Sequence, residues 1–247
     1  MSIESPEELA ALQRVGHICH LALAAMRKSV RPGFTTSELA DIGAQVMREN
    51  GARSAPVMVY GFPADILVSV NDEAVHGIPG SRRLEAGDLV KLDVTFEKDG
   101  YMADAAITVP VEPVAQETTR LARCAERAFN RAMRVARAGN PVSEIGREVE
   151  REVKHSGFSV IRALCGHGIG RTIHEPPSVL NYEDRLSRER LTPGLVITVE
   201  PIISAGAART ATAEDGWTER TIDGSLSAHF EHTIVITERA PILLTAA

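Results

Sequence analysis

The chain has 247 residues, of which 44% are hydrophobic and 24% are charged, a composition typical of an ordinary folded domain. Its formal net charge of -6 argues against a general nucleic-acid-binding protein, because affinity for phosphates comes mostly from lysine and arginine. The sequence has no apolar run near the roughly 18 residues that span a membrane, and its three scattered cysteines form no CxxC motif. We therefore expect a cytoplasmic protein with no nucleic-acid substrate and no membrane partner.

The first half of the chain contains one clear helix signal, followed by two strand signals. An amphipathic run begins near Ser37 and stops at Gly51, and we expect the serine to cap this helix and the glycine to end it. The strand GDLVKLD then ends in Asp93, and the strand DAAITV begins with Asp104.

Between these strands, the dipeptide Asp99-Gly100 is typical of a two-residue β-hairpin turn. A turn at this place puts Thr95 opposite Asp104 and leaves Asp93 on the same sheet face, diagonally from Asp104. Diagonal neighbours are about 7–8 Å apart at the backbone, so two carboxylate tips can converge on one ion.

The second half of the chain repeats these signals in the same order. A helix signal starts near Ser143 and stops at Gly157, shifted by 106 residues from its counterpart. The strand GLVITVE ends in Glu200, shifted by 107 residues. The strand EHTIVI begins with Glu231, and its shift of 127 residues is larger because an insertion precedes it.

This repetition predicts two related halves, roughly residues 10–110 and 117–240, within a single domain over residues 1–247. The fold class that follows is α+β, with helices covering one face of an antiparallel sheet. The other face of the sheet would form a cleft, and the duplicated carboxylates would meet there.

The four carboxylates at matched strand positions can be interpreted in two ways. On an isolated hairpin, Asp93 and Asp104 would be solvated residues on an exposed sheet face. Glu200, however, ends a strongly apolar strand, and buried carboxylates that meet without a cation repel one another. Divalent cations such as Mn, Fe, Co or Zn would remove this conflict, because oxygen and nitrogen donors suit them.

The loop CGHGIGRTIHEPP, residues 165–177, offers the nitrogen donors for such a site. Its glycines permit tight turns, so that His167 and His174 can approach a reacting centre. Either histidine can complete the metal site, and the other can then act on the substrate. A site with several carboxylates and one histidine usually holds two metal ions about 3.5–4 Å apart.

The chain resembles the type I methionine aminopeptidases of peptidase family M24A, which have the pita-bread (creatinase/aminopeptidase) fold. The resemblance covers nearly the whole chain and rests on five motifs that occur in the order and spacing of that family. These motifs are NDEAVHGIP (71–79), LDVTFEKDGYMADAA (92–106), GHGIGRTIHEPPSV (166–179), ITVEP (197–201) and SLSAHFEHTIVIT (225–237).

The resemblance implies a metal-dependent hydrolase that removes the initiator methionine from nascent proteins and peptides, preferring a small second residue. It also implies two divalent metal ions, whose identity among Co, Mn, Fe and Zn stays open. Asp104 and Glu231 would bridge both ions, and Glu200 would serve as the general base for a metal-activated water. The five implied ligands are Asp93, Asp104, His167, Glu200 and Glu231.

The same resemblance implies roles in substrate binding. His174 would contact the scissile carbonyl or the developing oxyanion, and His76 would hydrogen-bond the amide nitrogen side and help the amine leave. An apolar pocket would hold the methionine side chain, because an unbranched thioether fits such a slot. The implied pocket residues are Val59, Phe62, Leu67, Ile173 and Trp217.

Several positions depart from the pattern of the family. Val59 and Phe62 stand where tyrosines are common, Leu67 stands where a cysteine often occurs, and Ile173 stands where an aromatic residue is common. These changes keep the pocket apolar but alter its shape. Ala105 replaces a common hydroxyl residue, so that a hydrogen bond behind the metal site is expected to be missing.

Three alternative functions use the same fold. An aminopeptidase for X-Pro bonds would share the five ligands but usually carries an additional N-terminal domain. A non-catalytic binding module and a creatinase-like, metal-free enzyme usually lack some of the ligands, all of which are present here. We expect the substrates to be nascent polypeptide N-termini, with transient ribosome association and a monomeric chain.

The remaining histidines receive no role in chemistry. His17 and His20 lie on a predicted helix, and the sequence assigns nothing to His155 or His229. His232 follows Glu231 directly, so we expect it to point to the opposite face of the strand.

Overall fold

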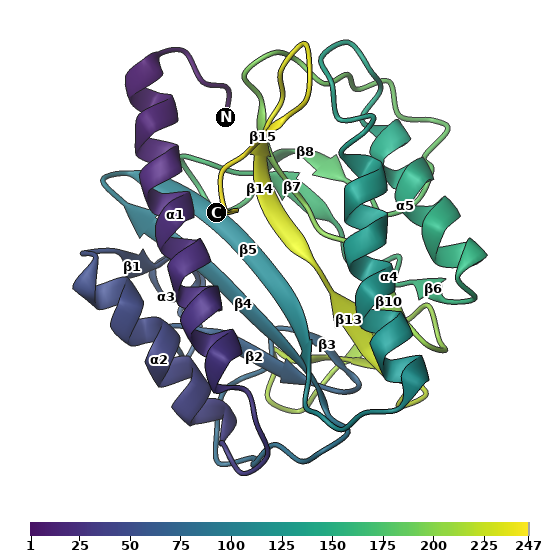
Figure 1. Ribbon diagram of the computed structural model, residues 1–247. Coiled ribbons are helices and arrows are strands. Elements are labelled where there is room, and N and C mark those ends of the chain that lie inside the picture. Colours follow the sequence, from purple (N-terminus) through teal and green to yellow (C-terminus); the bar gives the residue numbers. More distant parts are fainter. Residues whose placement is uncertain (247) are drawn as a thin grey trace.

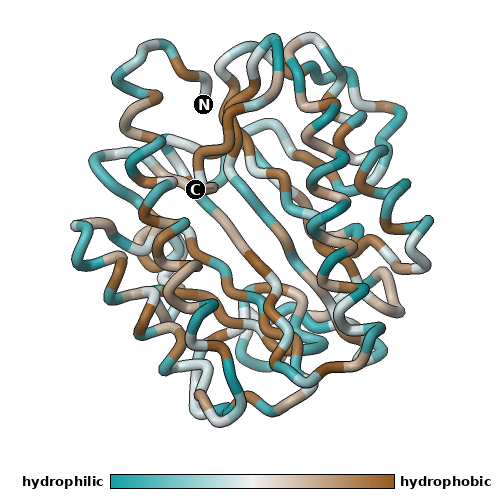
Figure 2. The backbone as a smooth tube through the Cα atoms, in the orientation of Figure 1, coloured by the Kyte–Doolittle hydropathy of each residue, from teal (hydrophilic) through white to brown (hydrophobic). Residues whose placement is uncertain are grey.

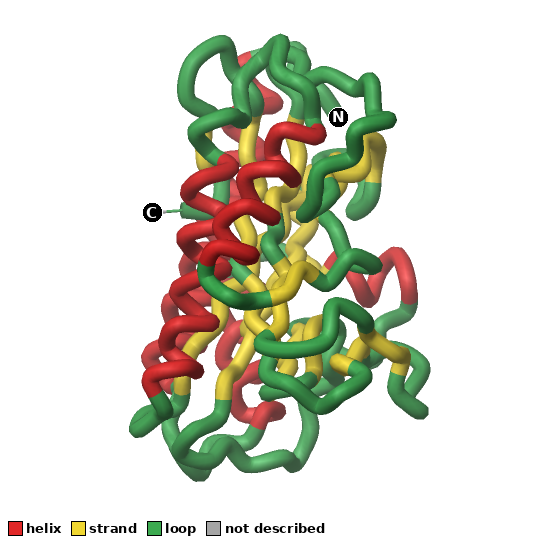
Figure 3. Tube along the Cα trace, turned by 90° about the vertical axis from the view of Figure 1, so that its right-hand side faces the viewer, coloured by secondary structure: helices red, strands yellow, loops and turns green. Residues whose placement is uncertain are grey.

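The computed structural model describes residues 1–246 and is built around a large antiparallel sheet with helices on one face (Figures 1 and 3). The first half contributes α1 (Pro6–Ser29) and α2 (Thr36–Glu49), and the second half contributes α4 (Gln116–Ala132) and α5 (Ser143–His155). A short helix, α3 (Ala55–Tyr60), follows the first strand. This arrangement of layers confirms the predicted α+β class.

The nine strands of the main sheet run in the order β1-β4-β5-β14-β9-β7-β8, with β2 paired to β4 and β15 paired to β14. Their bounds are β1 (Arg53–Ser54), β2 (Leu67–Val70), β4 (Leu89–Lys98), β5 (Tyr101–Pro110), β7 (Gly166–Gly168), β8 (Glu175–Val179), β9 (Val196–Val199), β14 (Glu231–Val235) and β15 (Ile242–Leu243).

Two three-stranded sheets complete the described part of the chain. One has the order β13 (Ser227–His229), β10 (Ile202–Ser204) and β6 (Ser159–Val160). The other has the order β11 (Thr210–Thr212), β12 (Glu219–Thr221) and β3 (Glu73–Val75), so that the insertion of the second half pairs with a strand of the first.

The register of the β4–β5 hairpin is the one that its turn residues predict. Thr95 pairs with Asp104, and Asp93 pairs with Ala106, one diagonal step from Asp104. The turn residues Asp99 and Gly100 have positive φ values of 54° and 83°, as a two-residue turn of this type requires. The predicted diagonal relation of the two aspartates is therefore confirmed.

Each half of the molecule has its own hydrophobic core. In the first half, α1 and α2 pack on β2, β4 and β5, and in the second half, α4 and α5 pack on strands that include β9 and β14. Figure 2 shows hydrophobic stretches along the central strands and hydrophilic residues on the outer turns of the helices. The two pairs of helices thus cover one face of the main sheet and leave its opposite face free for a site.

Helix α1 has the length and hydropathy of a membrane-spanning helix. Half of its most apolar window is buried inside the protein, where the helix packs against β4 and β5 (Figure 1). Its apolar residues are therefore accounted for by the core of this fold.

The helix ends agree with the sequence only in part. Gly51 and Gly157 follow the ends of α2 and α5 in left-handed conformations with φ values of 64° and 83°, as predicted. The prediction that serines cap both helices was wrong. Thr35 caps α2 in a capping box with Glu38, and Val142 precedes α5 without a side-chain cap.

Equivalent contacts recur in the two halves at the shift seen in the sequence. The Arg83 guanidinium donates a 2.6 Å hydrogen bond to the carbonyl of Gly33, and Arg190 donates one of 2.6 Å to the carbonyl of Gly139. Both glycines have a φ of 90°. These matched contacts support the predicted internal repeat.

Candidate metal centre

The structure brings carboxylates from both halves to one face of the main sheet. Their strands β4, β5, β14, β9 and β7 are successive neighbours in the sheet, which explains how residues far apart in sequence come together. The side chains concerned are Asp93 on β4, Asp104 on β5, Glu231 on β14, Glu200 directly after β9 and His167 on β7.

Four of these five side chains belong to two compact groups of donor atoms. One oxygen or nitrogen from each of Asp104, His167 and Glu231 lies within 4.8 Å of the others. Glu200 and Glu231 form a second group of this size with His229. The Nε2 atom of His167 is 3.6 Å from Oε1 of Glu200, which links the two groups. Asp93 lines the same cavity but belongs to neither group.

Burial makes these carboxylates hard to ionise. Burial raises the pKa of Asp104 to about 7, and burial followed by the charge of Asp104 raises the pKa of Glu200 to about 8. The pKa values of Asp93 and Glu231 lie well above their ordinary range, first because of burial and then because of the neighbouring carboxylates. Such a cluster is costly unless cations compensate its charge.

The residues present fit divalent metal ions. Within residues 1–246, Oδ1 of Asp104 and Oε1 of Glu231 are buried without a hydrogen-bond partner, although buried polar atoms are normally paired. The Nδ1 atom of His167 lies 2.9 Å from the carbonyl of Gly168, a contact that leaves Nε2 facing the carboxylates as a donor atom. Oxygen donors with imidazole nitrogen suit Mn, Fe, Co and Zn.

Thr198 on β9 connects two of the expected ligands. Its hydroxyl donates a 2.8 Å hydrogen bond to Oε1 of Glu200 and accepts one of 3.1 Å from the backbone N–H of His167. The backbone carbonyl of Glu200 accepts a further hydrogen bond of 2.9 Å from Asn181. The bond from Thr198 orients the Glu200 carboxylate, and the bond from Asn181 holds the Glu200 backbone.

The centre lies at one wall of a cavity of about 660 Å³. The cavity is also lined by six residues for which the family resemblance implied substrate-binding roles: His76, His174, Phe62, Leu67, Ile173 and Trp217. The rings of Phe62 and Trp217 meet edge to face with centroids 5.2 Å apart, forming an apolar wall. Val59 does not line the cavity, and 46% of its surface is exposed.

Tyr60 is a cavity residue that the sequence reasoning missed. Its hydroxyl lies 2.5 Å from Nδ1 of His174, and the two rings are 5.6 Å apart. This contact holds the His174 ring, which also packs on the ring of His167 at 4.1 Å. No sequence signal separated Tyr60 from its neighbour Val59.

His76 is held in the cavity by an unusual backbone. Its φ of 60° is rare for a residue with a side chain, and such positions cluster at functional sites. The next residue, Gly77, donates a 2.9 Å hydrogen bond to the hydroxyl of Ser69, and the Thr218 hydroxyl donates one of 3.4 Å to the carbonyl of His76.

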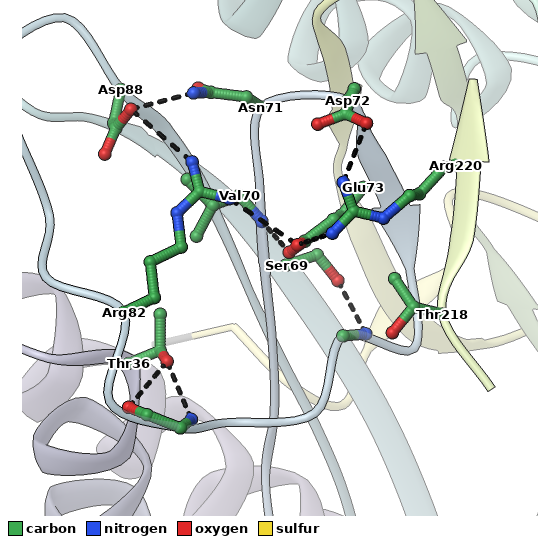
Figure 4. A network of polar contacts seen from close by, with 12 residues as sticks. Thr36, Ser69, Val70, Asn71, Asp72, Glu73, Arg82, Asp88, Thr218 and Arg220 are labelled. Carbon is green, nitrogen blue, oxygen red and sulfur yellow. Dashed lines mark hydrogen bonds and ion pairs between the residues drawn. The ribbon is translucent and has the colours of Figure 1, made fainter. Parts of the chain in front are cut away.

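A network of charged residues supports this loop (Figure 4). Arg220 on β12 donates hydrogen bonds to Asp72 at 3.0 Å and to Glu73 at 2.6 Å. Arg82 reaches Glu73 from the other side at 3.5 Å. The network ties the hairpin that carries Trp217 to the turn that precedes His76.

His229, to which the sequence assigned no role, is buried beside Glu200 and Glu231, with its Nε2 3.8 Å and 3.4 Å from their Oε2 atoms. The sequence offered no periodic signal for it, because β13 is only three residues long. His232 is turned away from the centre as predicted, and its Nδ1 lies 2.8 Å from the Thr245 hydroxyl. Cys165 lines the cavity, and burial raises the pKa of its thiol.

Comparisons with known proteins identify the family to which the chain belongs. The model of metallopeptidase family M24 matches residues 10–238. Methionine aminopeptidase 2 of Bacillus subtilis is 42% identical over 247 residues, covering 99% of both chains. A methionine aminopeptidase of Clostridium perfringens is 37% identical over 243 residues, covering 98% of both chains.

Solved structures also superpose on the chain. The crystal structure of methionine aminopeptidase from Rickettsia prowazekii superposes with a TM-score of 0.95 at 35% identity, covering 99% of this chain and 100% of that one. The prolidase of Pyrococcus furiosus has a TM-score of 0.79 at 24% identity, with 65% of that chain covered, so it shares the pita-bread fold alone. By sequence and by structure, the chain belongs to metallopeptidase family M24 and, within it, to the methionine aminopeptidases.

Proposed function

We propose that the protein removes the N-terminal methionine from nascent proteins and peptides, preferring a small second residue. The observation that carries this proposal is the juxtaposition of a carboxylate–histidine cluster with an apolar wall in one cavity. The full-length relatives that are named methionine aminopeptidases support the choice of methionine.

Five residues would hold two divalent ions: Asp93, Asp104, His167, Glu200 and Glu231. When bound, the ions would supply positive charge that polarises the scissile carbonyl and makes a water molecule more acidic. Mn, Fe, Co and Zn all suit this donor set.

Glu200 is suited to move the proton of the attacking water. Its carboxylate is oriented by the 2.8 Å hydrogen bond from Thr198, and it lines the cavity where the substrate carbonyl would lie. In the proposed reaction Glu200 accepts this proton and then passes it to the departing amine.

Two histidines act on the peptide itself. The contact with Tyr60 places His174 at the cavity wall, where its other ring nitrogen can donate to the oxyanion that develops on the scissile carbonyl. His76, held by the backbone contacts around Gly77, faces the same space and hydrogen-bonds the amide nitrogen side of the substrate.

The methionine side chain would enter between Phe62, Trp217 and Ile173. These side chains offer an apolar surface that adapts to an unbranched thioether. The free amino group of the substrate would lie near Asp93, which would restrict cleavage to the first residue of a chain. N-termini that emerge during synthesis are the proposed substrates, reached through transient association with the ribosome.

The test is hydrolysis of Met-Ala-Ser and Ala-Pro-Ala by metal-free protein reloaded separately with Mn, Fe, Co or Zn. We expect release of methionine from Met-Ala-Ser and no cleavage of Ala-Pro-Ala. Cleavage of Ala-Pro-Ala alone would replace the proposal by an X-Pro aminopeptidase. Inactivity with all four metals would favour a binding module.

A further inference from the structure

His229 is a buried histidine whose ring is not satisfied by the protein. It ends β13, and only 2% of its surface is exposed. Neither ring nitrogen has a hydrogen-bond partner among residues 1–246. Because leaving a buried polar group unpaired is costly, we expect a ring in this position to bind a ligand.

The distances around His229 fit metal coordination better than hydrogen bonding. Its Nε2 is 3.4 Å from Oε2 of Glu231 and 3.8 Å from Oε2 of Glu200, and neither contact has the geometry of a hydrogen bond. Two donor atoms about 2.1 Å from one ion in tetrahedral geometry are about 3.4 Å apart. The expected ligand pair of His167 and Glu200 has a similar separation, 3.6 Å.

The backbone of His229 is fixed in the orientation that aims its ring at the centre. The Thr108 hydroxyl on β5 donates a 2.7 Å hydrogen bond to the carbonyl of His229 and accepts one of 2.8 Å from its N–H. The residue also pairs with Ile202 on β10. Both contacts come from strands next to the site and fix the backbone from which the His229 side chain extends, while the 3.4 Å separation of Nε2 from Glu231 Oε2 shows that the ring faces the centre.

We propose that His229 is a second imidazole ligand of the metal centre, bound to the ion that Glu200 and Glu231 also hold. The centre then has two histidines, one on each side of Glu200, instead of the single histidine of the expected set. This inference rests on the proposed function, because it takes the centre to be a metal site. Added imidazole nitrogen favours Fe, Co and Zn over Mn, which prefers carboxylate oxygen.

The first test counts imidazoles on a bound metal. Metal-free protein is loaded with substoichiometric Cu²⁺, and pulsed electron paramagnetic resonance counts the coordinated imidazole nitrogens. We expect the count to fall by one in His229→Gln and to stay unchanged in His232→Asn. His232 is a matched control, because it lies three residues further on and its Nδ1 contacts Thr245 away from the centre. An unchanged count in His229→Gln would overturn the proposal.

Calorimetric titration with Co²⁺ supplies an independent measurement. His229→Gln should bind Co²⁺ at least about tenfold more weakly than the wild type, since even residues behind the ligands contribute this much. Weaker binding with an unchanged imidazole count would show that His229 orients a carboxylate, which would also overturn its role as a ligand. Neither readout depends on hydrolysis. Inactivity of the wild type toward Met-Ala-Ser would therefore count against the proposed function and leave the ligand assignment standing.

A crystal structure of the Co²⁺-loaded wild type decides the matter if His229→Gln does not fold. A distance from Nε2 of His229 to the ion within about 2.3 Å would support coordination. A hydrogen bond from this nitrogen to a carboxylate oxygen, with the ion out of reach, would overturn it.

Discussion

At the scale of single residues, the geometry of His174 depends on a partner that lies far away in the sequence. The ring is held between the hydroxyl of Tyr60 and the ring of His167. A histidine on a glycine-rich loop would otherwise sample many orientations. The tyrosine therefore determines where the histidine can donate a hydrogen bond.

We expect His174→Ala to lower kcat for Met-Ala-Ser about 10²–10³-fold, the usual effect of removing one oxyanion donor. Tyr60→Phe should lower kcat less, by about tenfold, because it removes one hydrogen bond that only positions the ring. Steady-state kinetics measures both. His155→Ala, an exposed change at the end of α5, is the control. Wild-type kcat in His174→Ala would contradict the role assigned to this residue.

Lys91 on β4 offers a residue-scale test of pH dependence. Burial lowers its pKa to about 7, and its ammonium donates a 2.7 Å hydrogen bond to the carbonyl of Asn71. Between pH 7 and pH 10.5 the unfolded chain holds this proton and the folded chain has lost it, so the free energy of unfolding should rise with pH. The charged groups around Lys91 are Glu73, Asp72, Arg82 and Asp88.

Lys91→Met should remove this rise, whose slope is at most about 1.4 kcal/mol per pH unit. Urea unfolding at pH 6.5 and pH 9.5 measures it. The free energy of unfolding of Lys91→Met minus that of the wild type should therefore be more positive at pH 6.5 than at pH 9.5. Lys98→Met, at the end of the same strand, should keep the wild-type slope. If Lys91→Met also kept the wild-type slope, the lowered pKa of Lys91 would be refuted as the cause of the pH dependence.

The sequence predicts residues well where a strand fixes their direction and poorly elsewhere. Asp93 and Asp104 could be placed because alternation along a strand decides which face a side chain occupies. Val59 and Tyr60 could not be told apart, because they lie on the short helix α3, where adjacent residues point about 100° apart. His229 was missed because pairing with β10, a contact between distant segments, sets its direction.

At the scale of elements, the hairpin register was predicted correctly and the helix caps were not. The turn at Asp99-Gly100 defines the pairing of every residue in β4 and β5. The start of α2 lies in the run Thr35-Thr36-Ser37, and the capping box with Glu38, three residues after Thr35, selects Thr35. This local signal was overlooked, whereas α5 starts after Val142 without any side-chain cap that the sequence could have indicated.

The link between β12 and the turn after β2 yields a prediction about substrate binding. Arg220→Met should remove both hydrogen bonds that hold the Trp217 hairpin to Asp72 and Glu73. Misplaced binding groups weaken binding and catalysis, so we expect KM for Met-Ala-Ser to rise about tenfold while kcat falls less. Arg209→Met, an exposed change before β11, is the matched control. An unchanged KM in Arg220→Met would show that the hairpin does not depend on this link.

At the scale of the whole molecule, stability should depend on the metal. Chelation leaves the buried carboxylates uncompensated, and returning Mn or Co at about 100 times its dissociation constant should add about 2.7 kcal/mol to the free energy of unfolding. Glu231→Gln should lose much of this gain, yet without metal it should be at least as stable as the wild type, because glutamine, unlike Glu231 with its raised pKa, need not take up a proton when the chain folds. Calorimetric melting with and without metal tests both statements. Equal melting of the wild type in the two conditions would contradict a buried metal centre.

The narrow junction between β5 and β14 has a consequence for how the two halves stay together. Two residue pairs join these strands, Glu231 with Ala106 and His232 with Ala105, and the Thr233 hydroxyl adds a 2.8 Å hydrogen bond to the carbonyl of Asp104. The ligands lie on both sides of this junction, so an ion bound there would act as a cross-link inside one chain. Opening of the junction in the metal-free protein would expose backbone amides of β5 and β14 to hydrogen exchange before the helical layers unfold.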